Sequence, residues 1–150
     1  MKPDLTKPCS APDHILGSVG YYQFRHDDFV RRFPHRDPPA YYMTYGDKYV
    51  RKFTNELCEK LSDEGKVWME KTKLRLQQEI ERKLAEEPQL ELDDEAFKDF
   101  AFQSHIQVYE ETNAMALSLA DKTAIIGCMD IKDLFGELGL QAIKVALHIH

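Results

Sequence analysis

Three of the six histidines lie in the first 37 residues, close to several carboxylates. The groups are Asp13-His14, His26-Asp27-Asp28 and His35-Arg36-Asp37. An imidazole can accept and release a proton near neutral pH, and a nearby carboxylate can orient it or activate water. His26, Asp28 and His35 are therefore the candidates for catalysis, and the chemistry that they would support is that of a small hydrolase, with or without a metal.

The spacing of these residues matches no metal-binding signature. The chain contains no HExxH, CxxC or EF-hand motif, and Pro34 separates His26 from His35. Cys9, Cys58 and Cys128 are odd in number and far apart, which is typical of free thiols. We therefore expect no metal and no cofactor, and solvated capping or turn roles are the alternative to catalysis for the histidines and aspartates.

Arginines followed by tyrosines form a second chemical grouping. They are Arg31, Arg32, Arg36, Tyr41, Tyr42 and Tyr45. Guanidinium groups can clamp a carboxylate or phosphate, and both residue types are enriched where proteins bind one another. Tyrosines at helical spacing also occur in cores. The sequence predicts a partner-binding face here, with packing as the competing explanation.

The tyrosines belong to a long helix predicted over about residues 38–61. Asp37 is placed to cap its start, and Pro38 suits the first helical position. Aromatic and apolar residues recur at helical steps, namely Tyr42, Tyr45, Tyr49, Phe53, Leu57 and Leu61. Gly46 lies in the same stripe, which predicts that another helix or a ligand approaches the backbone there.

A second long helix is predicted over about residues 63–86. Ser62 can cap it, Asp63 and Glu64 suit its first turn, and Pro88 ends it. Its apolar stripe consists of Met69, Thr72, Leu76, Ile80 and Leu84. The short link between the two helices predicts an antiparallel pair.

The remaining chain also favours helices. A short helix is expected before Pro34, a third long helix from Asp93 or Asp94, and later helices at about 121–128, 130–135 and after Gly139. The β-branched segment 123–129 leaves a strand as an alternative. Residues 1–20 are predicted to form an extended N-terminal arm. The predicted fold is a single all-α domain over residues 1–150, a compact bundle of about five to seven helices.

Composition favours a soluble globular protein, with 43% hydrophobic and 31% charged residues. No apolar run is long enough for a membrane span or a signal peptide, so we expect a cytoplasmic location and no membrane partner. The acidic net charge of −6 argues against nucleic acid. The favoured interpretation is an adaptor or regulatory domain that binds another protein. The alternatives are the hydrolase and a homo-oligomer assembled through the long helices.

Overall fold

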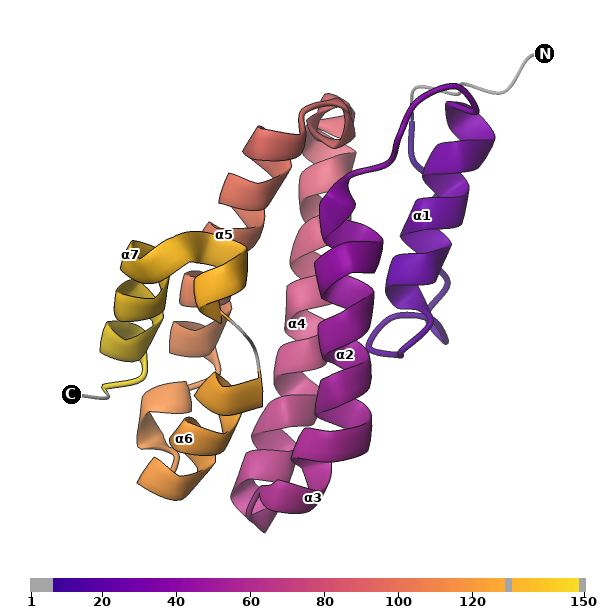
Figure 1. Ribbon diagram of the computed structural model, residues 1–150. Helices are drawn as coiled ribbons and strands as arrows, with labels where there is room; N and C mark the ends of the chain where they lie inside the picture. The colour runs from indigo at the N-terminus through magenta and orange to yellow at the C-terminus, as the bar shows by residue number, and fades with distance from the viewer. Residues whose placement is uncertain (1–6, 129–130, 149–150) are drawn as a thin grey trace.

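The computed structural model describes residues 7–128 and 131–148, and regular structure in this part of the chain is entirely helical. Two long helices lie side by side at the centre of the molecule, with α1 (Tyr21–Arg32) along one side (Figure 1). On the other side lie α5 (Asp94–Glu111), α6 (Leu119–Cys128) and α7 (Ile131–Ala146). This arrangement confirms the predicted all-α bundle.

The central pair is the predicted antiparallel one. Its first helix spans residues 41–60 and contains two π-helical segments, η1 (Tyr41–Asp47) and η2 (Phe53–Leu57), which alternate with α2 (Lys48–Lys52) and α3 (Cys58–Lys60). Its second helix is α4 (Asp63–Glu86). In a π-helix the hydrogen bonds run from residue i to i+5, and such segments occur often where a structure has special packing or functional demands.

Local signals in the sequence account for both ends of α4. The Ser62 side chain accepts a hydrogen bond from the Gly65 N–H at 3.1 Å, as an N-cap does, and the first turn is acidic. The helix ends at Glu86, two residues before Pro88. The predicted stripe of α4, from Met69 to Leu84, is buried.

The start of helix 41–60 differs from the prediction. Asp37 is exposed and does not cap it; instead the Ala40 N–H donates to Asp94 Oδ1 at 2.9 Å. Asp94 belongs to α5 (Asp94–Glu111) and is far away in sequence. Pro38 and Pro39 precede the helix, so the first free backbone donor is that of Ala40, and a tertiary neighbour satisfies it.

Gly46 marks a close helix crossing, as predicted. A β-carbon at this position would lie 2.5 Å from two ring carbons of Tyr22 in α1. Tyr22 is buried, and its ring lies 6.0 Å from that of Tyr41. The absence of a side chain at residue 46 therefore lets α1 approach helix 41–60.

Beyond α4 the chain forms α5, two short 3-10 helices and two further helices. Pro88–Leu92 (η3) precedes α5, Ala114–Ala116 (η4) follows it, and α6 (Leu119–Cys128) and α7 (Ile131–Ala146) complete the fold. Residues 123–128 are therefore helical. Gly136, with φ of 80° and ψ of 177°, interrupts α7, consistent with the two helices predicted there. Asp130, the predicted cap, lies outside the described residues.

Asp121 connects α6 to α4 rather than capping α6. The Ser118 hydroxyl accepts from the Asp121 N–H at 3.1 Å, so Ser118 occupies the capping position. The Asp121 carboxylate accepts from the Ser62 N–H at 2.9 Å and from the Ser62 hydroxyl at 2.5 Å. A negative charge at the start of α4 also complements its dipole.

Two apolar clusters form the core. One cluster joins α1 and helix 41–60 to the C-terminal half of α4 and the N-terminal half of α5. It contains Tyr21, Tyr22, Tyr41, Tyr42, Ile80 and Phe97. The other joins Phe53, Trp68, Met69, Tyr109, Ile125 and Ile143. The arm segment 7–20 contains no regular helix and packs against α4, where the Ala11 N–H donates to Glu81 Oε1 at 2.6 Å.

Candidate functional site

The predicted Arg- and Tyr-rich face is divided between the core and the surface. Arg32, Tyr41 and Tyr42 are buried, whereas Arg31 and Arg36 are exposed and Tyr45 is half-buried. The three buried residues expose at most 6% of their surface to solvent. Only the exposed arginines and Tyr45 remain available to a partner.

Arg32 lies at the centre of a buried ionic network. Its Nε donates to Asp28 Oδ2 at 2.9 Å, and its Nη2 donates to Glu91 Oε1 at 2.5 Å. The Tyr42 hydroxyl donates to the second oxygen of Glu91 at 2.7 Å. Glu91 lies in η3, so this network joins α1 and helix 41–60 to the turn before α5.

Ionisation in this network follows from burial and pairing. Burial and the neighbouring Glu91 charge raise the pKa of Tyr42 well above its ordinary value, so its hydroxyl stays protonated and donates. Burial alone would raise the pKa of Asp28, but hydrogen bonds from Arg31 and Arg32 and the charges of Arg32 and Arg25 outweigh it and lower that pKa. The network is therefore built from charged, mutually paired groups.

The candidate catalytic side chains of His26, Asp28 and His35 do not contact one another among the described residues. His26 contacts Asp27, with 3.2 Å between Nδ1 and Oδ1, and His35 is exposed on the loop after α1. Asp28 is occupied by Arg31, at 2.9 Å, and by Arg32. Within residues 7–128 and 131–148, no three His, Cys, Asp or Glu side chains are placed to share a metal ion.

An apolar groove between α5 and α7 was not predicted from the sequence. It has a volume of about 690 Å³ and is open to solvent. Its walls include Phe102 and Ile106 from α5, Met115 from η4, and Ala142 and Val145 from α7. Val145 is 71% exposed, and Leu138, seven residues earlier in α7, is 86% exposed. In the sequence, the only signal for this groove was that the segment forming α7 is rich in apolar residues. Which of these residues stay exposed depends on how α7 packs against α5, and the sequence does not show this.

Aromatic contacts fix the two walls of the groove relative to each other. The Phe135 ring of α7 lies 5.0 Å from that of Phe102 and 5.5 Å from that of His105. His105 is buried, and its Nδ1 lies 2.7 Å from the Ala101 carbonyl oxygen. Burial lowers the pKa of His105, so this part of α5 carries a neutral imidazole at neutral pH.

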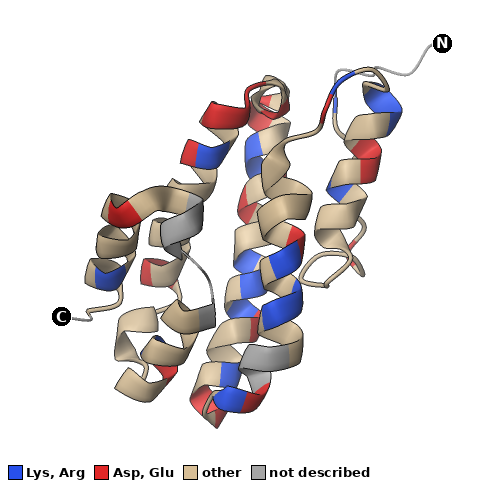
Figure 2. Ribbon diagram, in the orientation of Figure 1, with Lys and Arg blue, Asp and Glu red and all other residues tan. Residues whose placement is uncertain are grey.

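Few charges surround this groove. Figure 2 shows charged residues along α4 and helix 41–60, whereas α6 and α7 are largely uncharged. Glu110 is exposed and is the acidic residue that lines the groove. No ion pair or hydrogen bond to its carboxylate occurs in the described part of the chain, so its charge is available to a partner.

Comparison with known proteins adds no relative from which a role could be transferred. The sequence matches no protein-family model, no curated protein and no solved structure. Among the described residues, no helix is both long enough and apolar enough to cross a membrane. The site must therefore be interpreted from its own geometry.

Proposed function

We propose that this chain is a protein-binding domain of the adaptor or regulatory type, which acts in the cytoplasm as its sequence leads us to expect. The observation that carries the proposal is the open apolar groove between α5 and α7, where Val145 leaves 71% of its surface in solvent. Contiguous exposed apolar surface costs free energy in water, and in folded proteins it is typical of contact sites.

The occupant that fits this groove is an amphipathic helix with a basic residue beside its apolar face. A groove between two packed helices accepts apolar side chains spaced three or four residues apart on a third helix. Glu110 on the groove wall would pair with a Lys or Arg of that helix. The net charge of −6 favours the approach of a basic segment over an acidic one.

The exposed part of the Arg-rich face remains a second contact surface in this proposal. Arg31 and Arg36 lie at the end of α1 and on the following loop, where Arg36 Nη2 is 3.4 Å from the Leu92 carbonyl oxygen. These cations suit an acidic partner segment. Arg31 belongs to α1, which lies on the opposite side of the central pair from α7, so Arg31 can be tested separately from the groove (Figure 1).

The test compares two valine substitutions in the full chain. Val145→Glu places a charge in the groove, and Val67→Glu is its matched control on α4, where the valine is 64% exposed. Each variant would be used to recover bound proteins from the native host, with native mass spectrometry to identify them. A partner helix would then be titrated as a synthetic peptide by fluorescence anisotropy.

We expect Val145→Glu to weaken peptide binding roughly 10-fold to 100-fold, since burial of a valine contributes about 1.5–3 kcal/mol. Val67→Glu should leave the affinity unchanged, and Glu110→Lys should weaken the binding of a basic peptide. Equal binding by wild type and Val145→Glu would refute the groove as the contact site. Self-association that Val145→Glu abolishes would instead identify a second copy as the occupant and refute the basic helix.

A further inference from the structure

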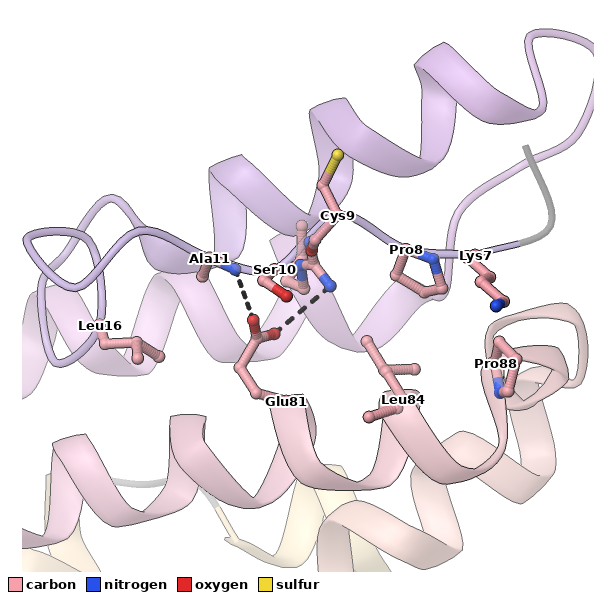
Figure 3. A pocket seen from close by; sticks show the side chains of 11 residues that line it. Lys7, Pro8, Cys9, Ser10, Ala11, Leu16, Glu81, Leu84 and Pro88 are labelled. Carbon is pink, nitrogen blue, oxygen red and sulfur yellow. Dashed lines mark hydrogen bonds and ion pairs between the residues drawn. The ribbon is translucent and has the colours of Figure 1, made fainter. Parts of the chain in front are cut away.

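A second cavity lies between the N-terminal arm and α4, away from the groove. It has a volume of about 460 Å³, within the range of small-molecule sites. Figure 3 shows the arm on one side of it and α4 on the other, with Glu81 between them. Its apolar lining consists of Pro8, Ala11, Leu16, Leu84, Ala85 and Pro88.

Hydrogen bonds hold the arm in place above this cavity. The Ala11 N–H donates to Glu81 Oε1 at 2.6 Å, and the Cys9 N–H lies 3.3 Å from Asp28 Oδ2. Arg25, which is buried, donates to the Cys9 carbonyl. The cavity wall formed by the arm is therefore anchored at residues 9 and 11 to both α1 and α4.

The acidic group in the wall is already neutralised. Glu81 Oε2 accepts from the Tyr21 hydroxyl at 2.7 Å and lies 3.3 Å from Arg25 Nη1. In the ionic network beyond it, the buried cations Arg25 and Arg32 and the exposed Arg31 pair with three carboxylates, namely Asp28, Glu81 and Glu91. The cavity therefore presents no unpaired carboxylate that would repel an anion.

Two donors on the arm have no partner in the described part of the chain. The Lys7 ammonium and the Ser10 hydroxyl line the cavity, and neither makes a hydrogen bond or ion pair there. In Figure 3 the Lys7 side chain extends from the arm beside Pro88, and Ser10 lies farther along the arm, near Glu81. Both residues are exposed, so water solvates these donors in the free protein. An anionic ligand seated in the cavity would gain a charge-assisted contact with the Lys7 ammonium.

We infer that this cavity binds a small carboxylic acid with an apolar body. The carboxylate would pair with the Lys7 ammonium, and the apolar body would lie against Leu84, Ala85 and the prolines. Such a ligand bridges the arm and α4, so it also stabilises the Ala11–Glu81 hydrogen bond. This site is separate from the helix-binding groove and does not depend on it.

The experiment titrates the full chain with octanoate as the probe and monitors binding by NMR of the backbone amides. Octanamide has the same chain length without the charge, and inorganic phosphate has charge without an apolar body. We expect octanoate to shift the amides of Ala11, Leu84 and Ala85 and to slow hydrogen exchange at Ala11. Octanamide should bind at least about tenfold more weakly than octanoate, because it cannot form the charge-assisted contact with Lys7.

Substitutions at the cavity distinguish a specific site from general adsorption. Lys7→Met should weaken octanoate about tenfold and leave octanamide unchanged, whereas Lys71→Met, at an exposed lysine elsewhere on α4, should change neither. Ala85→Phe should fill the cavity and abolish binding of both. No octanoate binding below about 10 mM, equal affinity for octanoate and octanamide, phosphate binding as tightly as octanoate, or unchanged affinity in Ala85→Phe would each overturn the inference.

Discussion

At the scale of single residues, the buried arginines are the most consequential feature. Arg32 and Glu91 form a buried pair, yet Arg32 Nη1 and Arg25 Nε have no hydrogen-bond partner in the described structure. Each buried donor left without a partner costs on the order of 1–3 kcal/mol. The network therefore specifies how α1 packs against its neighbours more than it adds stability.

Removing one member of this pair should be costly. Arg32→Met leaves Glu91 buried without its cation, so we expect the free energy of unfolding to fall by about 3–5 kcal/mol. Urea denaturation would measure the change. Arg31→Met is the control because Arg31 is exposed, and it should lower the free energy of unfolding far less than Arg32→Met does. The double variant Arg32→Met with Glu91→Met should recover most of the loss, and a double variant as unstable as Arg32→Met would contradict this account.

His105 should make stability depend on pH. Burial lowers its pKa below the ordinary value of 6.5, although the hydrogen bond to the Ala101 carbonyl opposes this shift. The unfolded chain therefore binds a proton more readily than the folded one, and stability should fall as the pH drops below 6.5. Urea titrations between about pH 8 and about pH 5 would show this loss in the wild type. The loss should be smaller in His105→Gln, and an identical profile in that variant would count against the prediction.

At the scale of elements, helix crossings depend on individual small residues. Alanine in place of an interior helical glycine normally stabilises a helix by about 1 kcal/mol. At Gly46 the new methyl group would overlap the Tyr22 ring, whereas at Gly127 in α6 nothing lies within 4 Å. The same substitution should therefore have opposite effects at the two positions.

We expect Gly46→Ala to destabilise the fold by about 1–3 kcal/mol, because α1 must move away from helix 41–60. Gly127→Ala should be neutral or stabilise it by up to about 1 kcal/mol. Thermal unfolding followed by circular dichroism would measure both. A Gly46→Ala protein as stable as Gly127→Ala would show that α1 does not pack as tightly as described.

At the scale of the whole molecule, α4 and α5 link the two halves of the core. The first cluster contains Ile80 and Phe97, and the second contains Met69 and Tyr109, so each long helix contributes to both. Asp121 further connects α6 to the start of α4. Disrupting either cluster therefore removes support from the other.

This connection predicts cooperative two-state unfolding. Trp68 is the single tryptophan, is buried in the second cluster and donates to Thr112 Oγ1 at 3.0 Å. Its fluorescence should change at the same urea concentration as the far-ultraviolet circular dichroism of the whole chain. Two separate midpoints would show that the halves unfold independently.

The sequence by itself determined the helices and the antiparallel central pair. The Ser62 cap, Pro88 and the stripe from Met69 to Leu84 act between residues a few positions apart, so local physical chemistry specifies them. The role of Gly46 was also predictable, because a glycine within an apolar stripe indicates close packing.

Only the tertiary structure decided which side chains reach solvent. Arg32 is buried because Glu91, 59 residues away in sequence, is placed to pair with it. Helix 41–60 begins at a cap supplied by Asp94, and the groove exists because α7 packs beside α5. These features depend on contacts between distant segments, and helical periodicity carries no information about which segments meet.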